Sequence, residues 1–572
     1  MSKEKQLING ISTPTPPIQL NGSIIMEYAG TIHGYREVVT RMPGHWHRYT
    51  YADMLTRVRK GANVLDSLGV KPGEIVGVWA YSTYRAFEIV YALMGKGVTF
   101  HLTNYAVPPQ DITYILNHLI DHAPYNVVFV EDNLVPTFDK IYSQLKTKPL
   151  KKMVIFGDNE KKAETSFKNV EYYEDLLSKA KSTYDWPQVD ETSAALLMTT
   201  SATTGRPKPF LHSHRNCWFQ SMGQAVTCGL GPMDNILVLP PFTHGGWFYW
   251  NTATMLGAKM ILPGPMATAE DFAACLIDEK ATFVGAVPVQ LTMIMNVIRQ
   301  RQAKGEKIDL TGTKVLYAGM KPTESLVRAY MDLGANCMQA YAYSEGCGPE
   351  VIANVPRPLN KDMSFDERVS FIRNVCGYPA IGVWTRIVDD NGNVLPWDGK
   401  SVGSVQTKFA FGVREYWESP EATEKGFTED HYLKAADLAQ ISEWCNMTLY
   451  DRAMDAIKSG GEWISSPFLE GEICEFTPVA EACVVGIKHP QWDERPIALI
   501  ALKPEYKGKA TEEDIRNFLL KKVDDGKIRK WAIPDKLIIV DAIPKNAVMK
   551  FDKRAVRQQY ADIFSEATGQ KE

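Results

Sequence analysis

From about residue 190 onward, short apolar runs alternate with longer amphipathic stretches. The apolar runs indicate strands, and they are "AALLMT" (194–199), "NILVLPP" (235–241), "ATFVGAVP" (281–288), "TKVLYAG" (313–319) and "NCMQAYAY" (336–343). The stretches between them indicate helices, at 215–228, 289–302 and 324–334. This alternation predicts mostly parallel sheets covered by helices. Ligands of such sheets bind where loops leave the carboxyl ends of the strands.

The rest of the chain divides into regions of different character. Before residue 185, "GEIVGVWAY" and "YNVVFVED" indicate further strands, whereas "TRIVDDNGNVLP" places an Asp-Asn-Gly turn between strand-like segments and predicts β structure over 385–450. A boundary near Asp451 precedes an α/β unit of the C-terminal part. With 572 residues the chain is long enough for several domains. We predict an α/β fold in which residues 1–450 form a large domain of stacked, mostly parallel sheets with helices and a small β region. Residues 456–572 then form a small α+β domain.

Composition limits the classes of binding partner and the cellular location that are expected for this protein. A net charge of −4 argues against nucleic acid as the main partner. The chain has no run of eighteen apolar residues, so no transmembrane segment is expected, and its start lacks the apolar region of a signal peptide. Nine Cys without a CxxC pair fit reduced thiols and predict a cytoplasmic protein. "HWH" (45–47) and "HSH" (212–214) lack partner clusters, so zinc is not expected there. The oligomeric state stays open, a homo-oligomer included.

A polar loop interrupts the first strand–helix unit of this region. "TTSATTGRPKPFLHSH" (199–214) concentrates hydroxyls, one Gly and Lys208. It is not a Walker loop, because Lys208 does not follow a Gly directly and Pro209 follows Lys208. Backbone N–H groups, hydroxyls and an ammonium suit a polyphosphate, but a solvated Ser/Thr turn explains the same composition. Composition alone leaves both interpretations open.

The order of residues in this loop carries a family resemblance. "TSATTGRPK" resembles the phosphate loop of the adenylate-forming enzymes, the acyl-CoA synthetase superfamily. Further segments resemble that family's motifs in the same order, and they are "LPPFTHGG" (239–246), "LYAGMKPTES" (316–325), "QAYAYSE" (339–345), "YLKAADLA" (432–439), "DRAMDAIKSGGEWIS" (451–465) and "IPKNAVMK" (543–550). The segments "HPQWDERP" and "KWAIPD" resemble the branch of medium-chain fatty acid:CoA and methylthiopropionate:CoA ligases.

The resemblance implies a two-step ligase. A carboxylic acid attacks ATP to give acyl-AMP and pyrophosphate, and CoA then displaces AMP, with Mg²⁺ assisting. Ser201, Thr203, Thr204 and Lys208 are implied at the phosphates, Tyr341 at the adenine, and Asp437 and Arg452 at the ribose. Gly205, Gly319 and Ser344 are further implied nucleotide-binding residues. Glu345 and Thr203 are the implied Mg²⁺ ligands. Lys550 is the implied adenylation lysine, His244 borders the acyl tunnel, and Gly460, Gly461 and Trp463 line the pantetheine path. Residues 451–455 would be a hinge, and 456–572 the domain that carries Lys550.

Each of these residues also has an ordinary structural explanation. Glu345 and Asp437 could be loop acids, Lys550 one more cation of a basic tail, His244 a structural histidine, and the two glycines a tight turn. The aromatic run 247–250 ("WFYW") either shortens the acyl tunnel, which would favour a short, branched or aromatic acid, or belongs to the core.

The chain also departs from the family pattern. Several family glycines are replaced, by Ala202, Pro209, Ala342, Ala435–Ala436 and Met549, and the usually charged hinge position holds Met454. A replacement at a position that needs positive φ would be strained. The charged residues nevertheless survive, which favours an active ligase over a non-catalytic nucleotide-binding homologue. A third alternative is an acyl-AMP ligase that loads a carrier protein, although "KSGGEWIS" favours CoA.

Overall fold

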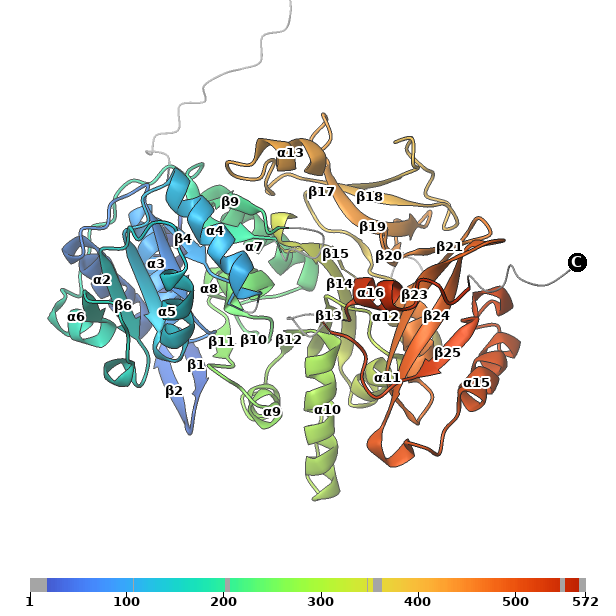
Figure 1. The fold of residues 1–572 in the computed structure, drawn as a ribbon. Helices are drawn as coiled ribbons and strands as arrows, with labels where there is room; N and C mark the ends of the chain where they lie inside the picture. Colours follow the sequence, from blue (N-terminus) through green and yellow to red (C-terminus); the bar gives the residue numbers. More distant parts are fainter. Residues whose placement is uncertain are drawn as a thin grey trace, which may run out of the picture.

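The computed structural model describes residues 18–105, 107–200, 206–346, 348–352, 363–545 and 551–564, with the backbone alone for 348–352. The strands of these residues form four sheets. In Figure 1 the blue to teal N-terminal elements and the orange to red C-terminal elements lie on opposite sides, with green elements between them.

The N-terminal sheet is parallel except at one edge. In spatial order its strands are β7 (Val170–Tyr172), β6 (Lys152–Phe156), β5 (Val127–Glu131), β3 (Ile75–Trp79), β4 (Thr99–Leu102), β8 (Ala194–Thr199) and β9 (Pro209–Ser213). Only the β8–β9 pairing within this described sheet is antiparallel. The two strands of that hairpin flank the polar loop, so the loop leaves the sheet at the carboxyl end of β8.

The central sheet has a parallel middle and antiparallel edges. Its strands in spatial order are β16 (Tyr378–Pro379), β15 (Gly348–Ile352), β14 (Asn336–Tyr343), β13 (Lys314–Ala318), β12 (Phe283–Ala286), β10 (Asn235–Val238), β11 (Lys259–Leu262), β1 (Glu37–Met42) and β2 (His45–Thr50). The pairings from β14 to β1 are parallel, whereas β15, β16 and β2 run antiparallel to their neighbours.

Two smaller sheets follow along the chain. The bridging sheet is antiparallel and consists of β17 (Val383–Val388), β18 (Val402–Phe409), β19 (Leu433–Ile441) and β20 (Met447–Arg452). The C-terminal sheet consists of β22 (Glu462–Ile464), β21 (Ile457–Ser459), β24 (Asp493–Leu502), β23 (Val479–His489) and β25 (Lys536–Ile539), the last paired in parallel with β24. The β structure predicted over 385–450 is therefore present.

Helices cover the sheets. They are α1 (Gly22–Ile32), α2 (Tyr51–Ser67), α3 (Tyr84–Lys96), α4 (Pro109–His122), α5 (Val135–Ser143), α6 (Tyr173–Lys179), α7 (His214–Cys228), α8 (Trp247–Leu256), α9 (Ala269–Ile277), α10 (Pro288–Ala303), α11 (Glu324–Asp332), α12 (Phe365–Asn374), α13 (Pro420–Gly426), α14 (Ser466–Cys474), α15 (Glu512–Asp524) and α16 (Lys553–Gln559). Capping boxes begin α2 at Thr50 and α15 at Thr511, where the hydroxyl accepts from the third helical N–H and the aspartate at that position accepts in return.

The largest hydrophobic cluster joins the two large sheets. It combines side chains of β3, β4 and β8 with side chains of β1, β10 and β11, and helices α3 and α8 contribute to it. Every residue of α3 is buried. A helix that is buried on all sides lies between two layers and not on the surface, so the stacked-sheet prediction is confirmed.

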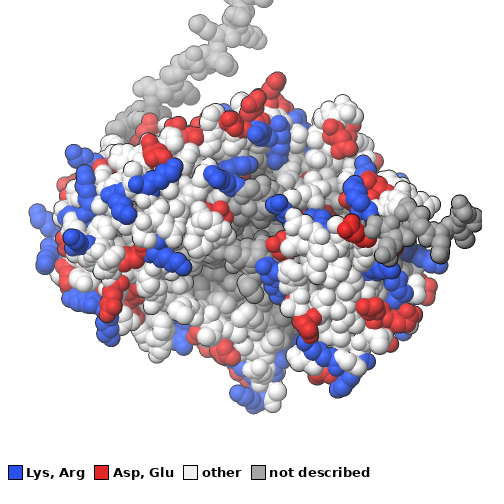
Figure 2. All heavy atoms as spheres, viewed as in Figure 1, with Lys and Arg blue, Asp and Glu red and all other residues white. Residues whose placement is uncertain are grey.

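Local sequence patterns predicted the elements of this region closely. The predicted strands 194–199 and 336–343 are β8 and β14 with the same bounds, and the predicted helix 215–228 is α7 with one residue added. Basic and acidic side chains intermingle over the face in Figure 2, in keeping with the small net charge.

Candidate active site

Lys208 stands at the base of the polar loop. Its backbone N–H donates to Thr200 Oγ1 (3.1 Å), and its carbonyl accepts from Thr200 N–H (3.0 Å). These bonds close the β8–β9 hairpin below the loop. The Lys208 ammonium lies 4.9 Å from the centre of the Tyr416 ring. Ser201, Thr203, Thr204 and Gly205, which the sequence assigns to the phosphates, lie outside the described residues.

Glu345 lies in a short turn, Ser344–Gly346, directly after β14. Two bonds hold the backbone of this turn: His212 Nε2 lies 2.9 Å from the Ser344 carbonyl, and Val413 N–H donates to the Glu345 carbonyl (2.9 Å). The Tyr416 hydroxyl donates to Glu345 Oε1 (2.9 Å). Burial raises the pKa of Glu345, and the Tyr416 hydroxyl and the Lys208 ammonium oppose this rise. Lys208 and Glu345 therefore converge on one tyrosine at the carboxyl ends of β8 and β14.

Asp437 lies on β19, opposite Arg452 of β20. The Tyr341 hydroxyl donates to Asp437 Oδ2 (2.6 Å), and Arg452 Nε lies 3.9 Å from Oδ1. Burial raises the pKa of Asp437, and both neighbours oppose it. Strand irregularities occur beside Tyr341 on β14 and between Leu438 and Ala439 on β19, where bulges commonly re-aim side chains. The structure thus joins three of the predicted nucleotide-binding residues.

Tyr341 has side-chain contacts that the sequence did not predict. Its ring is buried and meets Tyr343 edge-on, with the ring centres 4.9 Å apart. Stacking on adenine therefore stays a prediction, while the hydroxyl contact to Asp437 is a structural fact.

Gly319 of the predicted nucleotide site and His244 of the predicted acyl tunnel both lie in tight backbone turns. Gly319 follows β13 with φ +79°, a conformation that side chains other than glycine rarely adopt. His244 lies in the π-helical turn Phe242–Gly246 with φ −136° and ψ −148°, and it is partly exposed. The tunnel role of His244 stays a prediction.

Gly460 and Gly461 form the two-residue loop between β21 and β22. Their φ values are +58° and +91°, and Ser459 pairs with Glu462 across the loop. A hairpin loop with two positive φ values strongly prefers glycine. The tight-turn explanation accounts for both glycines, so their role at pantetheine is an additional prediction. Trp463 follows on β22, with the Lys458 ammonium 5.1 Å from its ring centre.

The predicted hinge is anchored on both sides. The Asp451 carboxylate accepts from Ser466 N–H of α14 (2.9 Å), and Asp455 pairs with Arg557 of α16 (2.6 Å). Ala453 N–H donates to the Ala436 carbonyl on β19 (2.9 Å). Burial raises the pKa of Asp451 to about 6. Met454, between these anchors, is half exposed. Lys550 lies outside the described residues.

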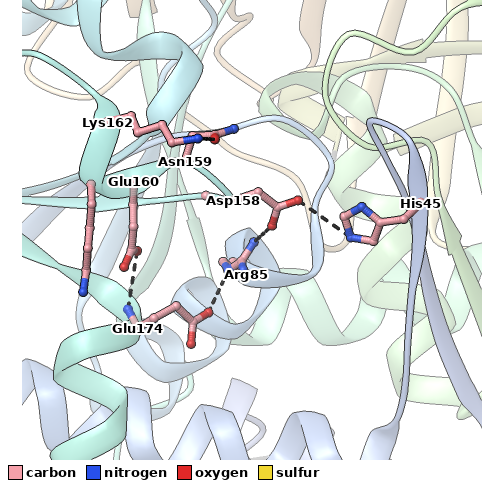
Figure 3. Close-up of a pocket in the computed structure, with 9 residues that line it drawn as sticks. His45, Arg85, Asp158, Asn159, Glu160, Lys162 and Glu174 are labelled. Carbon is pink, nitrogen blue, oxygen red and sulfur yellow. Dashed lines mark hydrogen bonds and ion pairs between the residues drawn. The ribbon is translucent and has the colours of Figure 1, made fainter.

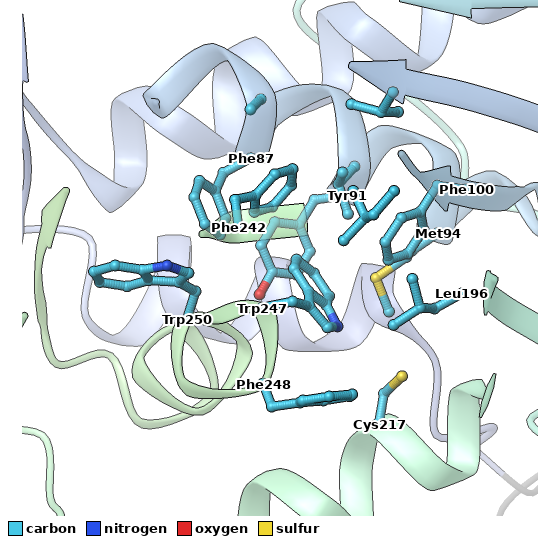
Figure 4. Close-up of a cluster of buried hydrophobic side chains, with 14 of the residues drawn as sticks. Phe87, Tyr91, Met94, Phe100, Leu196, Cys217, Phe242, Trp247, Phe248 and Trp250 are labelled. Atoms are coloured by element: carbon cyan, nitrogen blue, oxygen red, sulfur yellow. The ribbon is translucent and has the colours of Figure 1, made fainter. Parts of the chain in front are cut away.

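The aromatic run 247–250 lies in the core. Trp247 packs against Phe87, Tyr91, Phe100 and Phe242, with ring centres 5.1 to 6.1 Å apart (Figure 4). Trp247 and Trp250 are fully buried. The structure therefore favours the core interpretation of these rings.

The replaced family glycines cause no left-handed strain where they are described. Among described non-glycine residues, positive φ occurs at Met266, Lys280, Glu418, His431, Cys445 and Asp493. Pro209, Ala342, Ala435 and Ala436 are not in this set, and Ala202 and Met549 lie outside the described residues. The departures at those four positions therefore do not argue against an intact site.

A surface cavity elsewhere in the molecule does not contribute to this site. A surface cavity of about 510 Å³ lies around Arg85, which pairs with Asp158 (2.9 Å) and Glu174 (2.7 Å) (Figure 3). It contains no predicted site residue.

In the described part of the chain, no group of three or more His, Cys, Asp or Glu side chains could hold a metal ion. No described helix is long and apolar enough to cross a membrane.

No sequence pattern singled out Tyr416 or the position of His212. Tyr416 lies in the loop between β18 and α13, 71 residues beyond Glu345, and a lone tyrosine there gives no periodic signal. In the sequence, His212 belongs only to the "HSH" segment, where zinc is not expected. It is fully buried, and burial lowers its pKa to about 4, so it stays neutral.

Comparisons with known proteins agree with this geometry. The family model "AMP-binding enzyme" matches residues 27–417, and the model "AMP-binding enzyme C-terminal domain" matches residues 469–550. A medium-chain-fatty-acid–CoA ligase of Ectopseudomonas oleovorans is 32% identical, with 95% of this chain and 96% of the relative covered. A 3-methylmercaptopropionyl-CoA ligase of Ruegeria lacuscaerulensis is 31% identical over 95% of this chain and 98% of its own.

Solved structures show the same fold. An anthranilate CoA ligase with bound anthranoyl-AMP superposes with a TM-score of 0.80 at 20% identity, covering 96% of this chain and 99% of that one. A benzoate CoA ligase from Burkholderia xenovorans gives a TM-score of 0.74 at 17% identity, covering 94% and 99%.

The stacked sheets and the two matching family models place the chain in the class of adenylate-forming enzymes. The chain belongs to the AMP-binding enzyme family. Within it the chain is an AMP-forming acid:CoA ligase, so the prediction from the motifs is confirmed.

Proposed function

We propose that this ligase joins a short- or medium-chain, branched or aromatic carboxylic acid to CoA through an acyl-AMP intermediate. The acid's carboxylate attacks the α-phosphorus of ATP and pyrophosphate leaves. The thiol of CoA then attacks the acyl carbonyl, and AMP leaves. The curated relatives named for medium-chain fatty acids and for 3-methylmercaptopropionate support the short- or medium-chain part of this choice. The core position of Trp247 and Trp250 removes the aromatic run as an argument for a short tunnel.

The first step requires that negative charge be offset as the carboxylate approaches the phosphates. In the proposal Lys208 meets the β- and γ-phosphates with Ser201, Thr203, Thr204 and Gly205. Glu345, with Thr203, would hold Mg²⁺, which usually binds through one or two carboxylates plus phosphate oxygens. A bound magnesium ion would neutralise charge on the pyrophosphate leaving group. The buried, hydrogen-bonded carboxylate of Glu345 fits that ligand set.

The nucleoside end is assigned to the second group of residues. Asp437 would accept from the ribose hydroxyls, as an ionised carboxylate does, with Arg452 beside it. Gly319, Tyr341 and Ser344 would contact the adenine side. The observation that Tyr341 and Arg452 both converge on Asp437 supports this assignment.

The small domain is assigned a role in both steps. Lys550 would reach the carboxylate and α-phosphate during adenylation, and Gly460, Gly461 and Trp463 would face pantetheine afterwards. Residues 451–455 would be the hinge between a domain of residues 1–450 and a domain of residues 456–572. The anchored neighbours of Met454 support a pivot there. A cytoplasmic location is supported by the free thiols of the described cysteines.

The convergence of Lys208 and Glu345 on Tyr416 carries the proposal, since it pairs a phosphate-binding cation with a metal-binding carboxylate. The test is pyrophosphate release from ATP with acids from acetate to decanoate, benzoates and 3-methylthiopropionate, each with CoA or an acyl-carrier protein. We expect acid-dependent pyrophosphate and acyl-CoA. ATP binding without pyrophosphate for any acid would instead identify a non-catalytic homologue, and acylation of the carrier alone would identify a carrier ligase.

A further inference from the structure

The loop between β18 and α13 is fastened to both halves of the candidate phosphate site. Val413 N–H donates to the Glu345 carbonyl (2.9 Å), and Trp417 N–H donates to the Pro209 carbonyl beside Lys208 (2.8 Å). Tyr416 lies between these two attachments. Its own N–H donates to Thr423 Oγ1 (2.9 Å), which closes the loop against α13. The backbone of Tyr416 is therefore fixed relative to both Lys208 and Glu345.

The side chain of Tyr416 contacts both charged groups. Its hydroxyl donates to Glu345 Oε1 (2.9 Å), and its ring centre lies 4.9 Å from the Lys208 ammonium. The Phe427 ring packs against it at 5.6 Å, and the side chain is almost fully buried. Burial, with help from Glu345, raises the pKa of Tyr416 far above its usual value. The phenol therefore keeps its proton and acts as a donor toward the carboxylate.

These contacts constrain the parts of the site that backbone bonds leave free. His212 and Val413 hold the carbonyls of the Ser344–Glu345 turn, but they do not orient the Glu345 carboxylate. Likewise, the hairpin bonds of Lys208 hold its backbone and not its ammonium. An aromatic face attracts an ammonium, and a hydroxyl fixes the rotation of a carboxylate. The Tyr416 side chain therefore restricts both the rotation of the Glu345 carboxylate and the position of the Lys208 ammonium.

We propose that Tyr416 is a positioning residue that aligns the Glu345 carboxylate for Mg²⁺ and the Lys208 ammonium for the ATP phosphates. The inference rests on the proposed function. Partners that orient a metal-ligating carboxylate typically change metal affinity or activity by about 10–100-fold when they are removed. The alternative is that Tyr416 only fills space against Phe427.

The hydroxyl and the ring can be tested separately. Tyr416→Phe removes the bond to Glu345 and keeps the ring beneath Lys208, whereas Tyr416→Leu removes both. Tyr142→Phe is the matched control, because Tyr142 is a partly buried tyrosine of α5 that stacks on Phe138 and is not one of the predicted site residues. The measurement is calorimetric binding of ATP to the full chain over a series of Mg²⁺ concentrations, with a melting curve for each variant.

We expect Tyr416→Phe to bind ATP without Mg²⁺ as the wild type does, but to need about 10–100-fold more Mg²⁺ for the metal-dependent gain in affinity. Tyr416→Leu should also weaken Mg²⁺-free ATP binding, by about two- to thirtyfold. If Tyr416→Phe and Tyr142→Phe both keep the wild-type Mg²⁺ dependence, Tyr416 is a packing residue and the inference is overturned while the proposed function stands. A wild-type chain that binds no ATP overturns the proposed function together with the inference. Should Tyr416→Leu fail to fold, Tyr416→Phe still decides.

Discussion

Arg373 and Glu472 form a buried ion pair between the large and the small domain. Arg373 Nη1 of α12 lies 2.6 Å from Glu472 Oε1 of α14, and the side chains are 5% and 1% exposed. Burial alone would raise the pKa of Glu472, but the charges of Arg373 and Lys522 lower it. Glu472 therefore stays ionised, and removing it leaves the buried Arg373 guanidinium with a longer contact to Glu475 (3.8 Å) in place of the 2.6 Å pair.

Glu472→Gln should accordingly destabilise the docking of the small domain by about 3–5 kcal/mol. The measurement is the urea midpoint of unfolding, together with proteolysis of the segment near Met454. Glu481→Gln is the control, since its pair with Lys545 (2.6 Å) is partly exposed and should contribute at most about 1 kcal/mol. Equal shifts for the two variants would contradict a special role for the buried pair.

Lys208→Ala should raise the requirement for ATP far more than the requirement for the acid. The ammonium is proposed to meet the terminal phosphates, and a lost charge-assisted contact costs about 1.5–3 kcal/mol, or roughly ten- to hundredfold. KM values for ATP and for the acid, measured by pyrophosphate release, check this. Lys161→Ala, an exposed lysine paired with Asp175, should change neither value. An unaltered ATP dependence in Lys208→Ala would remove the polar loop from the site.

Lys550→Ala should separate the two half-reactions. In the proposal, adenylation needs this lysine at the α-phosphate, whereas thioester formation would use a different face of the small domain. The variant should therefore lose acyl-AMP formation and still convert supplied acyl-AMP to acyl-CoA. Lys545→Ala, which removes the pair with Glu481 and the contact with the Phe551 ring, serves as the control. Normal pyrophosphate release from Lys550→Ala would show that the catalytic lysine is assigned wrongly.

Trp247→Ala should destabilise the large domain without changing the preferred acid. A fully buried indole leaves a large cavity, and such truncations typically cost about 3–5 kcal/mol. Melting temperature and a chain-length profile of kcat/KM are the paired measurements. A shift of the preferred acid toward longer chains, with unchanged melting temperature, would show that the Trp247 ring lines the acyl tunnel.

Acid should destabilise the fold partly through His101. Burial lowers its pKa from 6.5 to about 3, so below pH 6.5 the unfolded chain binds a proton that the folded chain does not. The contribution of His101 to the free energy of unfolding is complete above about pH 6.5 and decreases as the pH falls toward 3. By about pH 5 the loss amounts to about 2 kcal/mol. His101→Gln should show a shallower fall in unfolding midpoint between pH 7 and pH 5. Parallel pH profiles for the two proteins would contradict this contribution.

The sequence by itself determined the elements and the identity of the chemical groups. "AALLMT" and "NCMQAYAY" became β8 and β14 with unchanged bounds, because an apolar run between polar loops is a local signal. The motifs likewise named Lys208, Glu345, Asp437 and Arg452, since their spacing within short segments survives in the chain. The tight turn expected at the glycine pair 460–461 is also a local signal, and the two positive φ values of this loop confirm it.

Only the tertiary structure decided which partners these groups have and where the aromatic run lies. Tyr416 reaches Glu345 across 71 residues, and Tyr341 reaches Asp437 across 96. Burial of Trp247 between the two large sheets likewise depends on how α3 and α8 pack. Local patterns record the preferences of neighbouring residues, whereas these contacts depend on long-range packing that brings distant loops to the same ends of the strands.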